Sequence, residues 1–345
     1  MFTDSLKKRG IERRRVLQIV AVAGAAGILG WPIFGRKSPD MRVVRRSRAM
    51  LGTVVNLTVY GRDREQAEGA VTDTLGRMAE LEGRLSRFRE DSEVGRLNRD
   101  GVVESAGDDL LTVLRLAQKV SGASAGAFDI TMLPLLSLYR RLGDHPAAID
   151  GPDGRAAIAE ARQRIDFRRL QIDGRRVSLA GGGMGITLDG IGKGHIVDQG
   201  AATLVAHGFE QVYVEAGGDL LVKGGKPGRE PWRIGIQNPR PAMARPLAVI
   251  AADSLAVATS GDYYQPFSPD FRYHHIIDPR TGFSAPELAA ATVTAPGAAL
   301  ADALATACLV LGSEGAFQLL AQFPGCEGYF VTKELNVRQT AGFPT

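Results

Sequence analysis

Asp302 and Thr306 stand one helical turn apart in residues 298–311, a segment that is otherwise apolar. Because positions i and i+4 share a face of a helix, the carboxylate and the hydroxyl would project together. Such hard oxygens suit Mg²⁺, which takes waters and substrate phosphates as its other ligands. The alternative is structural: the helix dipole favours a negative charge near a helix N-terminus, and Thr306 would bond back to the chain.

Glycines crowd residues 181–208, where we expect a strand to feed a helix through a turn with the sequence TLDGIGKG. Glycine lets backbone N–H groups approach a phosphate closely, and a helix N-terminus favours negative charge. Lys193 would add a point charge to such a cradle. The segment is not a Walker A loop, because that motif places Ser or Thr directly after the lysine. A tight structural turn without a ligand is the alternative.

The segment YHHIIDPRTG, residues 273–282, ends in a turn with proline at its second position and glycine at its end. Such a turn would pin the preceding strand. Because neighbouring strand residues face opposite ways, we expect only one of His274 and His275 to point into a pocket, and we favour His275. A structural histidine is the alternative. A phosphate cradle, a fixed histidine and a hard-metal pair together suit phosphoryl transfer from a pyrophosphate.

The candidate site residues must be held in place by strands and helices. Along the chain, strands occur in consecutive groups and helices lie between these groups. Alternating, β-branched segments predict strands, whereas apolar residues at helical spacing predict helices. We expect strands at residues 42–60 with a break at 51–52, 170–179, 211–223, 232–237, 247–252, 255–259, 327–332 and 335–339, and helices at 64–87, 109–121, 156–164, 298–311 and 316–323. Consecutive strands joined by short turns predict an α+β fold with largely antiparallel sheets. No GxGxxG fingerprint follows the first strand, which argues against a Rossmann domain.

The basic charge of the chain is concentrated at its N-terminus. The 42 basic and 38 acidic residues give a net charge of +4, and much of the excess lies in the first fifty residues. Residues 13–15 are arginines that precede an apolar stretch rich in Ala and Gly, which is typical of a twin-arginine export signal. We therefore predict a signal at residues 1–38 and a periplasmic location. The basic pI arises from this N-terminal segment and not from a basic surface of the folded domain, so no nucleic-acid partner is expected.

A membrane anchor is the alternative for the same N-terminal segment. Residues 16–34 are apolar except for Gln18. A bilayer-spanning helix needs roughly 17 to 25 such residues, so this stretch is long enough. The segment would then contact the inner membrane, and the sequence does not decide whether the signal is cleaved.

Five segments in this order resemble the ApbE family of FAD:protein FMN transferases: LDGIGKGHIVD, VEAGGDLLVKG, AVATSGDYYQ, HHIIDPRTG and ADALATACLVLG. Upstream, MLGTVVNLTVYG, SRFREDSEVGRLN and GAFDITMLPL are similar to earlier blocks of the family. The resemblance runs from about residue 48 to the C-terminus. It implies a flavin transferase domain at residues 39–345 that uses Mg²⁺ to transfer FMN from FAD to a threonine hydroxyl of a target protein, with release of AMP.

The resemblance also implies roles for individual residues. Mg²⁺ would be held by the backbone carbonyl of Gly190 together with Asp302 and Thr306. His275 would contact the pyrophosphate or take the proton of the acceptor threonine, and Ile276 would pack against the cofactor. The FAD site would be lined by Met50, Phe88, Ala127, Phe128, Asp129, Thr187 and Lys193.

This sequence departs from the family pattern at the glycine turn. Many members have DLGGIAKG where this chain has TLDGIGKG, so Thr187 replaces an aspartate and Asp189 replaces a glycine. Asp189 supplies the carboxylate from a shifted position, or a flavin contact is lost. Phe88 stands where the family often has tyrosine, and Leu133 replaces a common glycine. The twin-arginine signal resembles the branch linked to nitrous oxide reduction, which implies a target flavoprotein in a membrane-bound electron-transfer system.

Two other functions fit the same residues. A Mg²⁺-dependent FAD pyrophosphatase would use water as the acceptor and release FMN and AMP. A flavin-binding assembly factor would bind FAD without chemistry. The hard-metal pair argues against the second, because passive flavin binding needs no metal.

Overall fold

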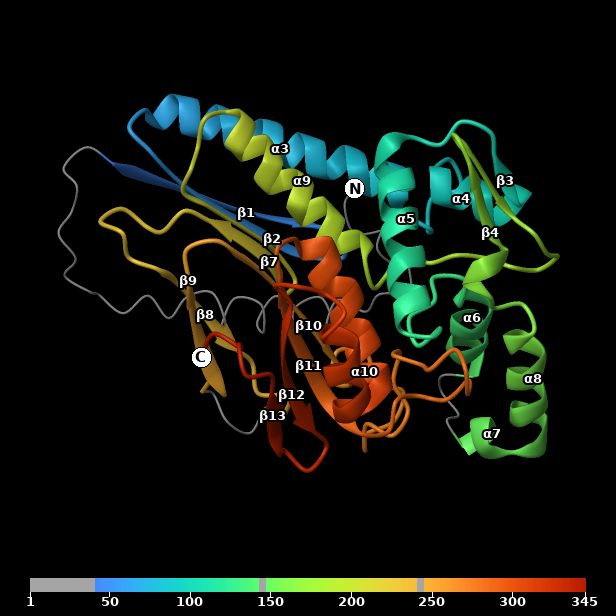
Figure 1. Ribbon diagram of the computed structural model, residues 1–345. Coiled ribbons are helices and arrows are strands. Elements are labelled where there is room, and N and C mark those ends of the chain that lie inside the picture. Colours follow the sequence, from blue (N-terminus) through green and yellow to red (C-terminus); the bar gives the residue numbers. More distant parts are fainter. Residues whose placement is uncertain (1–40, 143–146, 241–244) are drawn as a thin grey trace, which may run out of the picture.

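An eight-stranded antiparallel sheet is the centre of the computed structural model, which describes residues 41–142, 147–240 and 245–345 (Figure 1). Its strand order is β1-β2-β6-β7-β10-β11-β12-β13. The bounds are β1 Arg42–Met50, β2 Thr53–Gly61, β6 Val212–Ala216, β7 Asp219–Lys223, β10 Leu255–Gly261, β11 Leu288–Ala295, β12 Glu327–Thr332 and β13 Val337–Gln339. Every neighbouring pair is antiparallel, so the predicted α+β class is confirmed.

Three helices pack on this sheet and bury the main core against it: α3 (Arg64–Leu85), α9 (Gly192–Ala206) and α10 (Ala298–Leu320). In Figure 1, α3 and α9 run side by side over one half of the sheet, and α10 lies over β10 and β11. The apolar positions of α3 recur at helical spacing and are buried, while the Asp63 carboxylate accepts hydrogen bonds from the first turn of α3. The core therefore fixes the relative positions of α9 and α10.

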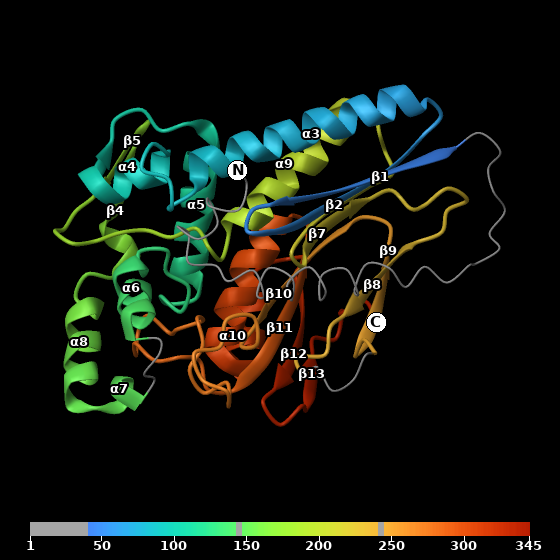
Figure 2. The same cartoon turned by 180° about the vertical axis from the view of Figure 1, so that it is seen from behind.

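Smaller units flank the sheet. The three-stranded sheet β3 (Val102–Val103), β5 (Arg176–Leu179) and β4 (Leu170–Asp173) lies beside α4 (Glu93–Asp100) and α5 (Asp108–Ala123). The helices α6 (Leu133–Leu142), α7 (Ala147–Asp150) and α8 (Pro152–Arg162) form a separate apolar cluster. The hairpin of β8 (Trp232–Ile236) and β9 (Ala248–Ala252) lies at the other end of the molecule from α6–α8, as the two opposite views show (Figure 2).

Helix α10 is interrupted at Gly312, whose φ of 73° and ψ of 177° are not helical. A Cβ at this position would lie 2.1 Å from the Glu287 carboxylate, so only glycine fits. The same carboxylate accepts hydrogen bonds from the Ser313 amide (2.9 Å) and hydroxyl (2.6 Å), which caps the second half of the helix. The two helices that the sequence predicts, at 298–311 and 316–323, are thus the two halves of α10.

Three features differ from the sequence-based expectations. Residues 181–191 form no strand before α9; Gly185 makes only an isolated bridge to Met132. Residues 273–277 are likewise held by isolated bridges rather than a strand. Strand β11, which the sequence did not predict, is buried along its whole length because it lies in the middle of the sheet under α10.

Helix α10 is the one helix of the described ranges that is long and apolar enough to cross a membrane, and most of it is buried inside the fold, as in a core helix. The predicted signal or anchor at residues 1–38 lies outside the described residues.

Candidate functional site

The N-terminal turns of α9 and α10 meet at the centre of the site. The Gly194 amide in α9 donates to Oδ2 of Asp302 in α10 at 3.1 Å, and the Asp302 side chain is buried. A Cβ on Gly194 would lie 2.3 Å from the carbonyl oxygen of Ala298, so only glycine allows the two backbones to approach this closely. Gly194 at the end of the glycine turn therefore allows α9 and α10 to pack closely.

Gly190 and Thr306 lie against each other. A Cβ on Gly190 would be 2.8 Å from Thr306 Oγ1 and 3.4 Å from the ring of Phe128. Thr306 Oγ1 also lies 3.1 Å from the hydroxyl of Ser260 at the end of β10, its side-chain hydrogen bond among the described residues. Of the three predicted magnesium ligands, the structure thus places Gly190 against Thr306, while Asp302 lies one helical turn before Thr306 on α10.

Lys193 links two carboxylates in this site. Its ammonium forms an ion pair with Asp219 and lies 3.8 Å from Asp302 Oδ2. Burial and the charge of Asp219 raise the pKa of Asp302 well above its ordinary value, while Lys193 opposes this shift. Burial disfavours the ammonium, but the charges of Asp219 and Asp302 outweigh it and raise the pKa of Lys193. A bound cation would therefore stabilise the charged form of the buried Asp302 carboxylate. Lys193 stays protonated.

A set of three or more His, Cys, Asp or Glu side chains placed to hold a metal does not occur in the described part of the chain. One carboxylate, one hydroxyl and one backbone carbonyl still suit Mg²⁺, which favours hard oxygens and keeps water or phosphate ligands. The same set does not suit a structural zinc site, which needs four Cys, His or carboxylate ligands.

His274 and His275 differ in exposure, although residues 273–277 do not form the strand on which the alternation argument depends. The His274 ring is fully buried, and its Nε2 lies 3.0 Å from the carbonyl oxygen of Ala285. His275 is partly exposed, and none of the described residues bonds to its buried Nδ1. Burial lowers the pKa of His275 to about 4, with charges from Asp189 and Lys193 as smaller influences. The imidazole is therefore neutral near pH 7, with a nitrogen available to accept a proton.

The DPRTG turn after His275 is held by α6 and α8. The Tyr139 hydroxyl in α6 donates to the Gly282 carbonyl at 2.8 Å, and Arg162 in α8 donates to the Arg280 carbonyl. The Asp278 carboxylate accepts from the Arg280 amide at 2.9 Å, which closes the turn. The turn thus fixes its histidine through side chains of a separate helical unit, instead of through the predicted strand.

Phe88 forms an exposed edge of the site. Its ring is 72% exposed, and the guanidinium of Arg87 lies 4.0 Å from its centroid and that of Arg140 5.5 Å. Arg87 also makes a bidentate ion pair with Asp189, with N–O distances of 2.8 to 3.1 Å. Thr187 is buried, and its hydroxyl accepts from the Asp189 amide at 3.2 Å. The Asp189 carboxylate is therefore engaged by Arg87.

The remaining predicted flavin-site residues are mostly packed inside the fold. The main core contains Met50, Ala127, Phe128 and Ile276. The Asp129 carboxylate accepts hydrogen bonds from the amide and hydroxyl of Thr131, each at 2.7 Å, and from the Phe167 amide at 2.9 Å. Asp129 thus shapes the loop that presents Phe128 to Gly190.

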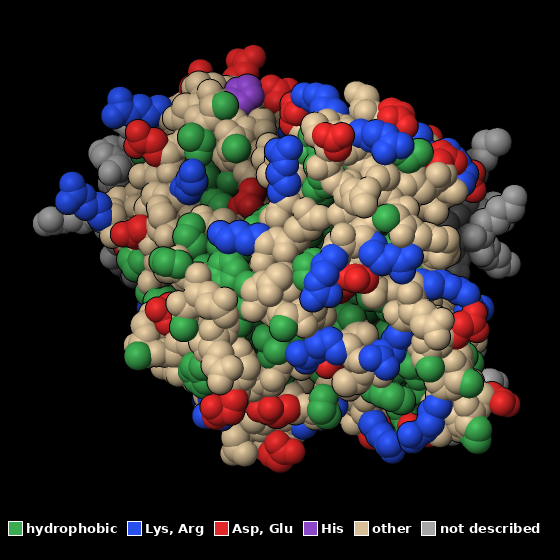
Figure 3. Space-filling model, turned by 45° about the vertical axis from the view of Figure 1, so that its right-hand side comes forward, with side chains coloured by type: hydrophobic (Ala, Val, Ile, Leu, Met, Phe, Trp, Pro, Cys, Tyr) green, Lys and Arg blue, Asp and Glu red, His purple; other side chains and the backbone are tan. Residues whose placement is uncertain are grey.

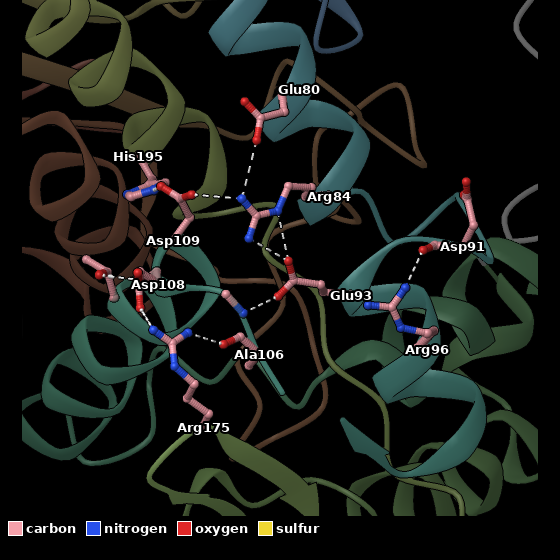
Figure 4. Close-up of polar contacts among 12 residues, drawn as sticks. Glu80, Arg84, Asp91, Glu93, Arg96, Ala106, Asp108, Asp109, Arg175 and His195 are labelled. Carbon is pink, nitrogen blue, oxygen red and sulfur yellow. Dashed lines mark hydrogen bonds and ion pairs between the residues drawn. The ribbon is translucent and has the colours of Figure 1, made fainter. Parts of the chain in front are cut away.

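A charged network of side chains from α3 and α5 contacts the first turn of α9 (Figure 4). Nε2 of His195, the residue after Gly194, lies 3.2 Å from the Asp109 carboxylate in α5. Asp109 also pairs with Arg77 at 2.8 Å and with Arg84 at 3.3 Å, both in α3. The first turn of α9 is therefore tied to two other helices. The sequence patterns did not single out this network, Asp219 or Arg87.

Basic, acidic and hydrophobic side chains are interspersed on the face turned forward in Figure 3, and basic side chains are prominent across its middle. An anionic substrate would meet a favourable charge on this face.

Comparisons with known proteins place the chain in a family and match its fold. The ApbE family model matches residues 51–330. The FAD:protein FMN transferase of Treponema pallidum is 33% identical over 325 residues, covering 88% of each chain. The enzyme of the same name from Vibrio cholerae is 33% identical over 248 residues, covering 69% of this chain and 72% of its own. The crystal structure of the ApbE protein from Thermotoga maritima has a TM-score of 0.77 and 29% identity, covering 88% of this chain and all of its own.

Proposed function

This chain belongs to the ApbE family, and from that premise we propose that it uses Mg²⁺ to transfer FMN from FAD to a threonine hydroxyl of an exported target protein. Relatives named FAD:protein FMN transferase favour transfer to protein over hydrolysis of FAD or passive binding. The chain is accordingly an FAD:protein FMN transferase.

The observation that supports the magnesium proposal is the contact of Gly190 with Thr306, which lies one helical turn after Asp302 on α10. Positions 302 and 306 share a face of α10, and a Cβ on Gly190 would lie 2.8 Å from the Thr306 hydroxyl. The ion would be held by these two side chains and the Gly190 carbonyl. When bound, Mg²⁺ supplies neutralisation of charge on the pyrophosphate oxygens.

The protein's own groups supply positioning and proton transfer. Lys193 is a fixed positive charge between Asp219 and Asp302, and it would attract the pyrophosphate of FAD. His275 would contact the pyrophosphate or take the proton of the acceptor hydroxyl, a step for which its pKa of about 4 makes it a weak base. The hydroxyl oxygen then forms a bond to the FMN phosphorus, the bond from that phosphorus to the bridging oxygen breaks, and AMP leaves with that oxygen.

The flavin end of FAD would lie at the exposed edge formed by Phe88. An aromatic ring flanked by two guanidiniums offers a flat surface for an isoalloxazine ring. Thr187, Ala127, Phe128, Asp129, Met50 and Ile276 would support this surface from the core side. Asp189, held by Arg87, would supply the carboxylate that the family pattern has at position 187, or a flavin contact is lost.

The N-terminal sequence is the basis of our proposals for the location of the enzyme and for the protein that it modifies. A twin-arginine signal at residues 1–38 would export the folded enzyme to the periplasm. The target would be a flavoprotein of a membrane-bound electron-transfer system that carries the acceptor threonine.

A peptide-labelling assay tests the function. The full chain is incubated with FAD, MgCl₂ and a threonine-bearing peptide, with and without a chelator, and the mass of the peptide is measured by mass spectrometry. We expect a gain equal to one FMN moiety that the chelator abolishes. Free FMN and AMP with unlabelled peptide would instead identify a pyrophosphatase, and intact FAD would identify a binding protein.

A further inference from the structure

Helices α9 and α10 lack N-terminal caps of their own. The residue before α9 is Ile191 and the residue before α10 is Gly297, and neither side chain accepts a hydrogen bond from its helix. The first N–H groups of a helix need partners, and a buried helix end without them is unfavourable. Something else must therefore satisfy these two ends.

Each helix receives its cap from the other. Asp198 in α9 accepts from the first turn of α10, through Oδ1 from the Ala298 amide at 2.6 Å and through Oδ2 from the Ala299 amide at 2.9 Å. In return, Asp302 in α10 accepts from the Gly194 amide in the first turn of α9. The two carboxylates thus cross between the helices in opposite directions.

This reciprocal capping explains how Asp302 keeps its position. Ala298 and Ala299 occupy the helical turn directly before Asp302, so holding their amides fixes where that turn begins. On the other side, the His195–Asp109 contact holds α9 to α5. Without Asp198, the polar links left between these turns, among the described residues, would be the Gly194 hydrogen bond to Oδ2 of Asp302 and the ion pair of Lys193 with the same oxygen at 3.8 Å.

We propose that Asp198 is a positioning residue for the metal site: by capping α10 from α9, it places Asp302 and Thr306 against Gly190. The inference rests on the proposed function, because it takes Asp302 and Thr306 to be the magnesium ligands. Residues that orient metal ligands from outside the ligand set typically change metal affinity about 10- to 100-fold when removed.

Asp63 supplies a matched control. It caps α3 by the same chemistry, accepting from the Glu65 amide at 2.8 Å and the Gln66 amide at 3.2 Å. Helix α3 carries none of the proposed ligands. Asp63→Ala therefore removes a helix cap and its stability, about 1 kcal/mol, without touching the docking of α9 on α10.

The test compares Mn²⁺ binding, followed by electron paramagnetic resonance, with thermal unfolding in the full chain. We expect Asp198→Ala to raise the Mn²⁺ concentration for half-saturation about tenfold or more, and Asp63→Ala to leave it unchanged although both variants melt earlier. Asp198→Asn, which keeps one acceptor oxygen and the size of the side chain, should fall between wild type and Asp198→Ala; it also serves if Asp198→Ala does not fold.

Two results would overturn the proposal, and they differ. If Asp302→Ala loses Mn²⁺ binding while both Asp198 variants bind as wild type, Asp198 is an ordinary cap and only the positioning role is wrong. If Asp302→Ala binds Mn²⁺ as tightly as wild type, the metal assignment itself is wrong, and the positioning role is lost with it.

Discussion

Replacing Gly194 by alanine should separate the two helices that build the site. The new Cβ would lie 2.3 Å from the carbonyl oxygen of Ala298, and also 2.7 Å from the Ala299 Cα. Both are backbone atoms of α10, which cannot rotate away as a flexible side chain would. Moving the contact from 2.3 Å to at least 3.0 Å requires a displacement of about 0.7 Å between α9 and α10.

The energetic cost follows from overpacking. Inserting one methyl into a packed interior typically costs about 1–3 kcal/mol, and the better helix propensity of alanine returns about 1 kcal/mol of this. We therefore expect Gly194→Ala to lower the free energy of unfolding by up to about 2 kcal/mol. Because catalytic groups misplaced by an ångström can cost about 100-fold in rate, kcat/KM for FMN transfer should fall by at least about tenfold.

Gly76→Ala in α3 is the control, because a Cβ added at this position would meet no atom within 4 Å outside its own stretch of helix. This variant should be stabilised by about 0.5–1 kcal/mol and keep full activity. Urea unfolding followed by circular dichroism gives the stabilities, and the peptide-labelling assay gives the rates. Wild-type stability together with wild-type kcat/KM in Gly194→Ala would refute the close-approach argument.

Three other substitutions probe the site. Thr306→Val removes the hydroxyl but keeps the shape, so the Mg²⁺ concentration for half-maximal transfer should rise on the order of tenfold, with an unfolding free energy within about 1 kcal/mol of wild type; an unchanged Mg²⁺ dependence would exclude Thr306 as a ligand. Burial lowers the pKa of His274 to about 4, so between pH 6.5 and 4 the unfolded chain binds a proton that the folded chain does not, and His274 should withdraw about 3 kcal/mol of stability as the pH falls through this window. His274→Gln should flatten that slope in urea unfolding at several pH values, and an equally steep slope would contradict the assignment. Tyr139→Phe leaves the buried Gly282 carbonyl without its partner, at a cost of about 1–3 kcal/mol; it should lower kcat for transfer more than it raises the KM for FAD, and a change in KM alone would show that the turn does not position His275.

The sequence predicted that Asp302 and Thr306 share one face of a helix, because residue spacing within one segment is enough to show this. Asp302 and Thr306 are four residues apart on a segment whose composition leaves little alternative to a buried helix, so their common face could be foreseen. The partners of that pair come from elsewhere: Asp219 is 83 residues away from Asp302, and Ser260 lies 46 residues away from Thr306 on β10. Nothing in the local pattern distinguishes Asp219 from any aspartate in a hairpin turn.

The fold shows the same division. Strand β2 alternates between buried and partly exposed positions, and the period-two pattern predicted it. Strand β11 carries small apolar residues at nearly every position because both of its faces are covered, so it has no such pattern. The glycine-rich segment before α9 was expected to be a strand, but it provides close contacts to α10 and Thr306 instead of ladder hydrogen bonds. Arg87 could not be linked to Asp189 from sequence, because 102 residues separate them.

The interruption of α10 at Gly312 has a consequence for how the chain tolerates change. In a continuous helix each residue is rotated by a fixed angle from the one before it. Adding or deleting one residue therefore rotates all later side chains about the helix axis by about 100°. At Gly312 this fixed rotation is interrupted, because the Glu287 carboxylate caps the second half of α10 as a new helix start. A length change between residues 313 and 320 should therefore leave the azimuth of Asp302 and Thr306 as it is, whereas the same change between residues 298 and 301 would rotate both oxygens relative to the Asp198 cap. Insertions and deletions in residues 313–320 of α10 should therefore leave the proposed ligands in residues 298–311 in place.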